Sequence, residues 1–150
     1  EGLSSLLKGH TPILEPRKST AITETQVPGL WVLSSGPAVS NASNLLYSPR
    51  LAEILRAARG DFDYILIDTP PMLQLADARI IGQHCDTVIL VVRAGKTTRD
   101  AARTARQKFA QDGTPMLGVI LNDWIPGVNG YGYDSKYYDR YSKYYNVKKD

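Results

Sequence analysis

The feature that most constrains the fold is a series of short apolar runs separated by segments with helical patterning. The runs are Leu30–Leu33, Tyr64–Ile67, Val88–Val92 and Met116–Leu121. The run Val88–Val92 is continuously apolar, which is typical of a parallel strand that is covered on both faces. Strands that alternate with helices imply a parallel sheet with right-handed crossover connections. We therefore expect an α/β fold with the order β-α-β-α-β-α-β up to Asn122.

The helices between these strands are predicted from apolar spacing and from residues that favour helix ends. Ser48 is expected to cap a helix in which Pro49 takes the first position, where its missing N–H costs little. Gly60 is expected to end that helix, because glycine interrupts the helical pattern there. The other helices are expected over 75–83 and 98–111, with a short one over 3–8, while the rest of residues 1–29 is expected to be an irregular connection.

The strongest local motif is the acidic residue that follows the run Tyr64–Ile67. Asp68 comes directly after the run and is followed by Thr69-Pro70-Pro71. In parallel sheets, ligands gather at the carboxyl ends of the strands. A carboxylate there holds Mg²⁺ or orients an attacking group beside bound phosphates, which is the Walker B arrangement. The alternative is that Asp68 only caps the following turn, but the Thr-Pro-Pro sequence favours the phosphate site.

Two further polar residues are candidates for the same site. Asp77 is either a second acid near Mg²⁺ or the N-cap of the helix that begins beside it, with the cap preferred. Asn122 ends the last strand, where its side-chain amide would contact a nucleotide base or would form a turn before Asp123. The sequence leaves both pairs of alternatives open.

The tripeptide Gly95-Lys96-Thr97 looks like the end of a phosphate-binding loop, but its spacing is wrong for one. The P-loop pattern requires Gly, any four residues and then Gly-Lys-Ser/Thr. Leu90, inside an expected strand, stands where the first Gly would be. This tripeptide is therefore not expected to wrap phosphate, and no complete pattern occurs elsewhere in the 150 residues.

Composition narrows the remaining classes of function. The formal net charge of +3 is too small to predict nucleic-acid binding by itself. Cys85 is the only cysteine, so an intrachain disulfide or a multi-cysteine metal site is impossible. Cys85, His10 and His84 are expected to be structural or incidental. No apolar run approaches the roughly 20 residues that span a bilayer.

The segment that begins at Asp123 differs from the rest because tyrosine dominates it. Seven of the nine tyrosines lie between Tyr131 and Tyr145. Since the segment has no aliphatic run, we expect a flexible tail over 123–150 after a partial domain over 1–122. Three interpretations stay open. The rings are phosphate acceptors, each gaining about −1.5 to −2 charge, or they stack on single-stranded nucleic acid, or the tail is adhesive and unregulated.

Together these segments resemble the bacterial tyrosine kinases of the capsular exopolysaccharide family. The Asp-Thr-Pro-Pro element alone is shared with ATPases that position division septa and partition plasmids, so the terminal tyrosine cluster separates the two groups. The resemblance rests on the segments 62–71, 76–78, 91–99 and 117–122, on Gly2-Leu3-Ser4, on Ser48-Pro49-Arg50 and on that cluster.

The resemblance implies a fold, a reaction and roles for individual residues. The fold is a parallel-sheet, P-loop NTPase-like domain with three Rossmann-like layers, incomplete at its N-terminus. The reaction is transfer of the γ-phosphate of ATP to tail tyrosines, usually between subunits of a ring, with Mg²⁺ as the metal. Asp68 matches the catalytic, metal-binding Walker B aspartate, and Asn122 matches the region near adenine. The acceptor cluster matches as a group Tyr131, Tyr133, Tyr137, Tyr138, Tyr141, Tyr144 and Tyr145.

The resemblance also implies partners and a location. The family regulates the synthesis and export of exopolysaccharide or capsule at the cytoplasmic face of the bacterial membrane. Its partners are neighbouring subunits and a membrane-embedded adaptor domain, and nucleic acid is not expected. The alternatives are a non-enzymatic interaction or substrate module, and a relative of the partition ATPases that binds DNA or membrane.

One departure from the family pattern bears on ATP binding. The family's Walker A loop precedes its Gly-Leu-Ser segment, which here begins at Gly2. We therefore expect a fragment that dimerises or swaps a segment to cover exposed sheet edges. Such a fragment would bind ATP weakly or not at all, because most phosphate contacts come from the Walker A loop.

Overall fold

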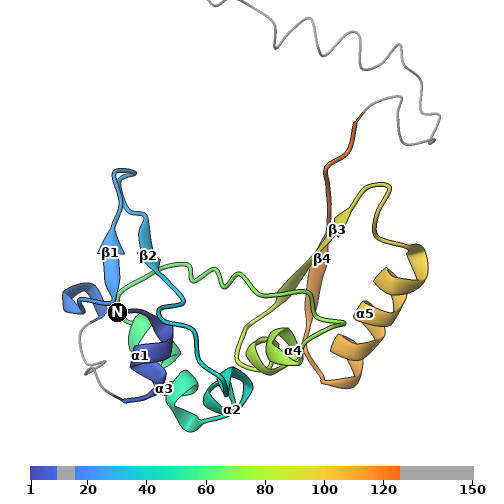
Figure 1. The fold of residues 1–150 in the computed structure, drawn as a ribbon. Helices are drawn as coiled ribbons and strands as arrows, with labels where there is room; N and C mark the ends of the chain where they lie inside the picture. The colour runs from blue at the N-terminus through green and yellow to red at the C-terminus, as the bar shows by residue number, and fades with distance from the viewer. Residues whose placement is uncertain (10–15, 126–150) are drawn as a thin grey trace, which may run out of the picture.

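The computed structural model describes residues 1–9 and 16–125 of the chain (Figure 1). It contains short helices and strands connected by extended segments. In chain order the elements are α1 (Leu3–Leu7), the 3₁₀ helix η1 (Pro16–Lys18), β1 (Ile22–Glu24), β2 (Trp31–Leu33), α2 (Ala42–Leu46), α3 (Pro49–Ala58), α4 (Asp77–Gly82), β3 (Val88–Arg93), α5 (Arg99–Gln111) and β4 (Met116–Asn122).

The four strands form two separate two-stranded sheets. β1 and β2 pair antiparallel, with Thr23 opposite Val32. β3 and β4 pair parallel, with Leu90 opposite Val119, and α5 makes the crossover between them. The β3-α5-β4 unit confirms the α/β class expected from the sequence. Because β3 and β4 are parallel, both end at the same edge of their sheet.

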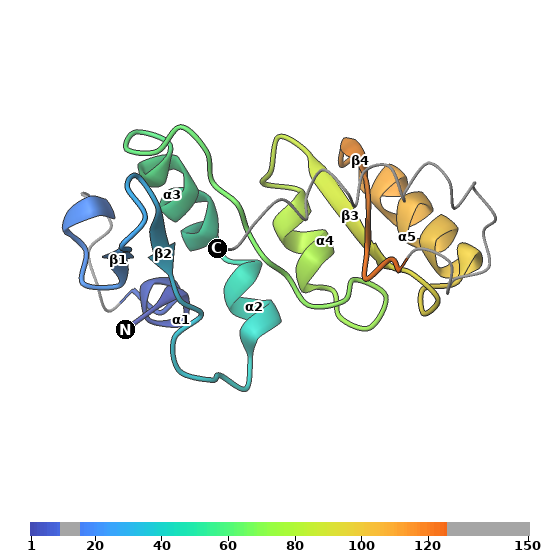
Figure 2. The same cartoon turned by 90° about the horizontal axis from the view of Figure 1, so that it is seen from above.

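The hydrophobic core lies where four helices meet. Figures 1 and 2 show α1, α2 and α3 beside the β1–β2 hairpin, and α4 and α5 beside β3 and β4. Ile80 and Ile81 of α4 pack in the same apolar cluster as side chains of α1, α2 and α3. The buried members of the cluster are Leu6, Leu7, Ala21, Leu46, Leu51, Ile54, Ile80 and Ile81.

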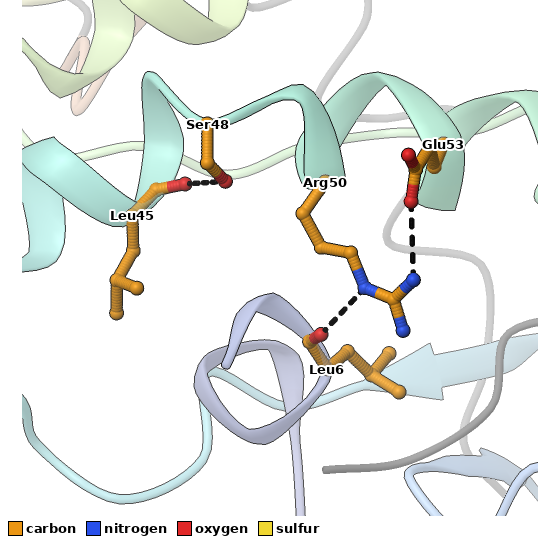
Figure 3. Close-up of polar contacts among 5 residues, drawn as sticks. All are labelled: Leu6, Leu45, Ser48, Arg50 and Glu53. Atoms are coloured by element: carbon orange, nitrogen blue, oxygen red, sulfur yellow. Dashed lines mark hydrogen bonds and ion pairs between the residues drawn. The ribbon is translucent and has the colours of Figure 1, made fainter. Parts of the chain in front are cut away.

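A charged side chain holds α3 against α1. Arg50 Nε donates a hydrogen bond to the carbonyl oxygen of Leu6 at 3.2 Å, and Arg50 Nη1 lies 3.0 Å from Glu53 Oε2 (Figure 3). The carbonyl of Leu6 lies in the last turn of α1, where carbonyls lack a full set of partners within the helix. Arg50 therefore links the first turn of α3 to the last turn of α1.

The start of α1 packs directly on the backbone that follows β2. The Leu3 amide donates to the Ser34 carbonyl at 2.8 Å. A Cβ atom on Gly2 would lie only 2.4 Å from the amide nitrogen of Gly36, and Gly36 itself has a φ of 77°. Glycine is needed at both positions, at the first for space and at the second for its conformation.

The expectation of an irregular connection through residues 1–29 is wrong in part. Ile22–Glu24 form β1, and the hairpin turn is closed by the Thr25 amide, which donates to the Leu30 carbonyl at 2.9 Å. A strand of three residues shows too little alternation to be recognised from sequence. As a result, Trp31–Leu33 pairs antiparallel with β1 rather than within a parallel sheet.

The four expected helices are present, and the cap expected for one of them is not formed. Ser48 precedes α3, but its hydroxyl donates to the Leu45 carbonyl at 2.6 Å (Figure 3). Thr98 does cap α5, since its hydroxyl accepts from the Ala101 amide at 3.1 Å. The five-residue helix α2 was not expected, because one turn is too short to show a period.

The largest difference from expectation concerns the run Tyr64–Ile67. It is extended but pairs with no strand in the part of the chain that the structure describes. The expectation that β3 is covered on both faces also fails, since the side chains of Ile89 and Val91 on one face are 46% and 58% exposed. Both observations have one physical cause: the two sheets do not join, so no layer covers these side chains.

We expect Leu51→Ala to destabilise the chain by about 2–5 kcal/mol, because Leu51 is fully buried in the apolar cluster and its loss leaves a cavity. Urea unfolding followed by circular dichroism measures the change. Leu66→Ala makes the same chemical change at a side chain that is 91% exposed, and should stay within about 0.5 kcal/mol of wild type. Equal losses in the two variants would contradict the placement of the core.

Candidate functional site

Asp68 lies on the extended segment that joins α3 to α4, and an aromatic cluster anchors the start of that segment. The guanidinium of Arg17 lies over the rings of Trp31 and Phe62, with its carbon 5.8 and 5.3 Å from their centroids. The two rings meet edge to face at 6.1 Å. Arg17 also donates to the Asp61 carbonyl. These contacts attach the segment to η1 and β2.

Side chains alternate along the segment as they would in a strand. Tyr64 and Leu66 are 88% and 91% exposed, whereas Ile65 is 37% exposed and Ile67 packs against the core. Asp68 follows and is exposed to solvent. Within the described residues, no hydrogen bond joins the backbone of 63–70 to another element. The carboxylate therefore stands at the end of a strand-like segment without a neighbouring strand.

A large groove of about 1020 Å³ lies beside this segment. Its walls come from the β1–β2 hairpin, α1, α3 and the segment 62–68, which includes Asp68. Most of its lining is aliphatic or aromatic, and charged lining residues are few (Arg17, Glu24, Asp63 and Asp68). Asp68 thus has access to solvent and to this groove.

Asp77 is the first residue of α4, and its carboxylate holds α2. Ser43 of α2 donates its hydroxyl to Asp77 Oδ1 at 2.7 Å. The position before the helix is occupied by Ala76, which makes no side-chain cap. The preferred interpretation of Asp77 as an N-cap is therefore wrong. The second interpretation, in which Asp77 is an acid near Mg²⁺, stays a prediction, since Ser43 contacts only one of its two carboxylate oxygens.

Two residues after Asp77, an ion pair fixes α4 to the end of α5. Arg79 donates through both Nε and Nη2 to the two carboxylate oxygens of Asp112, with 2.6 Å for the Nε contact. The hydrogen bonds from Arg79 lower the pKa of Asp112, and those to Asp112 raise the pKa of Arg79. Bidentate pairs of this kind set orientation as well as distance. Asp77 is therefore positioned relative to both α2 and α5.

Asn122 lies at the carboxyl edge of the β3–β4 sheet, within a small polar network. Its Oδ1 accepts from the Asp123 amide at 2.9 Å, and Asp123 has a φ of 58°. The Asp123 carboxylate lies 2.7 Å from Arg93 Nε, which joins the ends of the two strands. Of the two alternatives for Asn122, the local contact with Asp123 is observed. Contact of the Asn122 amide with a nucleotide base stays a prediction.

Gly95-Lys96-Thr97 forms a tight turn closed on itself. The amides of Lys96 and Thr97 donate to the Arg93 carbonyl at 3.1 and 2.8 Å, and the Thr97 hydroxyl accepts from the Arg93 amide at 2.9 Å. A phosphate-binding loop needs such amides turned toward the phosphate. These amides are already used, in agreement with the expectation from spacing.

The lone cysteine has a structural environment. Cys85 is half-buried, and its thiol donates to the Ile81 carbonyl at 3.3 Å. Burial raises the pKa of the thiol, and the nearby charge of Asp86 raises it further. A raised pKa makes a thiol a poor nucleophile at neutral pH. Among residues 1–9 and 16–125 no group of three or more His, Cys, Asp or Glu residues is arranged to hold a metal.

The candidate residues lie on three separate elements of the fold. Asp68 lies on the extended segment, Asp77 at the start of α4, and Asn122 at the end of β4. No described contact joins any two of them. His10 and the seven tail tyrosines lie outside the described residues. The cluster of Arg17, Trp31 and Phe62, which positions the Asp68 segment, had no signal in the sequence because its members are far apart along the chain.

The chain is similar in sequence to several bacterial kinases, although no family model matches it. It is 37% identical over 132 residues to the tyrosine-protein kinase CpsD of Streptococcus agalactiae, covering 88% of this chain and 55% of that protein. It is 36% identical over 139 residues to the tyrosine-protein kinase wzc of Salmonella typhimurium, covering 93% of this chain and 18% of that protein.

Solved structures give the same result. The kinase domain of the Escherichia coli tyrosine kinase ETK superposes with a TM-score of 0.77 at 31% identity, over 89% of this chain and 51% of that one. The kinase domain of VpsO gives a TM-score of 0.74 at 33% identity, over 83% of this chain and 59% of that one. The chain therefore spans about half the length of these kinase domains.

We expect the stabilising effect of the Arg79–Asp112 pair to disappear in acid. Because Asp112 has a lowered pKa in the folded chain, its contribution is present above its ordinary value of 3.8 and is lost as the pH falls through the lower folded value. Asp112→Asn should therefore lower the free energy of unfolding at pH 7, and the difference from wild type should shrink as the pH falls below 3.8 and through the lower pKa of Asp112 in the folded chain.

Urea unfolding at a series of pH values measures this difference. Asp63→Asn, which removes an exposed carboxylate on the segment before Asp68, serves as the control and should leave stability at pH 7 unchanged. A difference between wild type and Asp112→Asn that is constant from pH 3 to pH 7 would show that the ion pair does not stabilise the chain.

Proposed function

Because the chain belongs to the bacterial tyrosine-kinase family, we propose that it forms the part of an ATP-dependent protein-tyrosine autokinase that carries the Walker B aspartate and the acceptor tyrosines. The observation that supports this most is the likeness to kinase domains over more than four-fifths of the chain at over 30% identity. As the resemblance of the sequence implies, the reaction would regulate the synthesis and export of exopolysaccharide.

Asp68 is the residue proposed to act at the metal. Its carboxylate is exposed, makes no described hydrogen bond and stands beside the groove, so its oxygens are available to a hard cation. Carboxylate oxygen and water are the ligands that Mg²⁺ prefers. Bound with ATP, Mg²⁺ would neutralise charge on the phosphates during transfer. The protein's part in such a reaction is mainly to position groups and stabilise charge.

Asp77 and Asn122 have supporting roles in this proposal. Asp77 would assist near the metal from the start of α4, where Ser43 already orients one of its oxygens. Asn122 would lie near the adenine base from the end of β4. We expect the 150 residues by themselves to bind ATP weakly or not at all, since they contain no complete Gly-x-x-x-x-Gly-Lys-Ser/Thr sequence.

The tyrosine-rich segment is the proposed phosphate acceptor. Each phosphotyrosine adds about −1.5 to −2 charge, so several would make a mildly basic segment strongly acidic. That change would release the segment from an acidic site or repel a neighbouring subunit. Neighbouring subunits and a membrane-embedded adaptor domain are the proposed partners, with the kinase at the inner face of the membrane. In the part of the chain that the structure describes, no helix has the length and apolarity to cross a membrane.

We expect Asp68→Asn to lower autophosphorylation of the full-length protein by at least about a hundredfold, because the amide no longer attracts the metal. Incubation with ATP and Mg²⁺, followed by quantitative phosphotyrosine mass spectrometry, measures the rate. Asp63→Asn removes a carboxylate from the same exposed segment and should keep the rate within about twofold. Comparable rates of autophosphorylation in Asp68→Asn and wild type would show that Asp68 does not act at the metal.

We expect replacement of all seven tail tyrosines by phenylalanine to abolish phosphate incorporation while ATP hydrolysis continues. The phenyl ring keeps the aromatic surface and lacks only the acceptor oxygen. Phosphate incorporation and ADP release are measured in parallel on the full-length protein. Phosphotyrosine that appears only after a separate kinase is added would favour the alternative of a substrate module without activity of its own.

A further inference from the structure

We propose that exposed arginine side chains of α5 bind the tyrosine-rich segment of the same chain once that segment carries phosphate. The surface consists of Arg99, Arg103 and Arg106, and we call it the arginine face. Its ligand is phosphotyrosine in the segment from Tyr131 to Tyr145. The proposal rests on the proposed function for the presence of phosphate on the segment, and its test uses no ATP.

The first support is the exposure of the arginine face. Its three residues recur at intervals of four and three positions, so they share one side of the helix. All three are exposed, and the side chain of Arg103 is 78% exposed. A different side of α5 bears the buried residues Ala105 and Phe109. In Figures 1 and 2, α5 lies at an outer edge of the described molecule, beside β3 and β4.

The second support is the concentration of positive charge around α5. Six of the 19 residues from Arg93 to Gln111 are Lys or Arg, and one is Asp. This stretch therefore has a net charge of +5, whereas the whole chain has +3. The one acid, Asp100, lies 4.0 Å from Arg103 and its side chain is 94% exposed. Ion pairs this exposed neutralise little, so the stretch attracts anions.

The third support is the place where the tyrosine-rich segment leaves the fold. The carboxylate of Asp123, directly after β4, lies 2.7 Å from Arg93 Nε at the end of β3. α5 begins six residues later, at Arg99, and its 13 residues are about 20 Å long. The eight residues from Asp123 to Tyr131 can span up to about 29 Å. Tyrosines of the segment can therefore reach the whole arginine face of their own chain.

Phosphorylation would reverse the charge of the segment and so control its docking. Between Tyr131 and Tyr145 the segment has three basic and two acidic residues, a net charge of +1 that α5 repels. Two phosphates, at about −1.5 to −2 each, change this charge to about −2 to −3. A guanidinium group binds phosphate through two parallel N–H···O bonds. Clusters of arginine are a recurring means of recognising phosphorylated segments.

An anionic membrane or a nucleic acid suits the arginine face less well. Proteins that bind single strands place aromatic rings beside basic residues, but the one aromatic residue of α5, Phe109, is buried. Helices that lie on membranes insert apolar side chains, but those of α5 face the core. The phosphorylated segment needs neither feature. Its attachment to the same chain also gives it an effective concentration of about a millimolar.

The test is the binding of a synthetic peptide to the 150-residue chain. The peptide has the sequence of residues 131–145 with phosphate on Tyr137, Tyr141 and Tyr144, which are spaced like the three arginines. Fluorescence anisotropy in about 0.15 M salt compares its Kd with that of the unphosphorylated peptide. We expect the phosphopeptide to bind at least about tenfold more tightly. A Kd above about 1 mM would overturn the proposal, because the attached segment would then be mostly undocked.

Two sets of three substitutions separate the arginine face from net charge. Glutamine at all three positions of the face should weaken phosphopeptide binding at least about tenfold, and Arg103→Gln alone should give part of that loss. The matched control combines Lys8→Gln, Arg56→Gln and Arg59→Gln, which remove the same charge from exposed positions of other helices. The control should keep the Kd within about twofold. Circular dichroism checks that each variant folds, and equal losses in the two sets would overturn the proposal.

Vesicles of equal parts phosphatidylserine and phosphatidylcholine give the comparison with a membrane. Sedimentation of the chain with these vesicles through the arginine face, together with equal binding of the two peptides, would overturn the proposal and assign the face to a membrane. Because the peptide is synthetic, its binding does not depend on kinase activity. Phosphopeptide binding by a full-length protein that never phosphorylates its own tyrosines would count against the proposed function and leave the arginine face supported.

Discussion

The apolar cluster shared by α1, α2, α3 and α4 is the interaction on which the rest of the structure depends. Leu6 and Leu51 are its most completely buried members, and Ile80 and Ile81 join α4 to it. Arg50 then joins α3 to α1 through a hydrogen bond, and the Arg79–Asp112 pair joins α4 to the end of α5. The extended segment between α3 and α4 is flanked at both ends by helices of this framework.

Sequence patterns predicted best those elements whose signals are local. The apolar spacing of these helices is read within one or two turns, and α3 and α5 begin within one residue of the expected starts. The strands β1 and β2 have three residues each, which is too few to show a period. Whether Tyr64–Ile67 pairs with another strand depends on segments distant in the sequence, so patterning did not determine it. The position of Asp77 beside a helix start favours a cap, whereas its actual contact is with Ser43, 34 positions away, which no local pattern reveals.

The candidate site is recognised more through likeness than through geometry. Taken alone, Asp68 is an exposed carboxylate beside a groove, and Asn122 is an amide in a turn. Neither arrangement specifies phosphate chemistry. The similarity to kinases over most of the chain is what supports the roles proposed for these positions. The amides of the turn at Gly95-Lys96-Thr97 already donate to the Arg93 carbonyl, so this turn is not a candidate for binding the phosphates.

The extended run Tyr64-Ile65-Leu66-Ile67, which exposes Tyr64 and Leu66, also has a consequence for solubility. Its four residues have the high β-propensity and the lack of charge and proline that mark the six- or seven-residue segments that stack in fibrils. Asp63 and Asp68 flank the run directly. Like charges repeated at every level of a stack repel one another, and such flanking residues restrain aggregation in other proteins. The carboxylate of Asp68 would thus protect the chain during synthesis, before any metal reaches it.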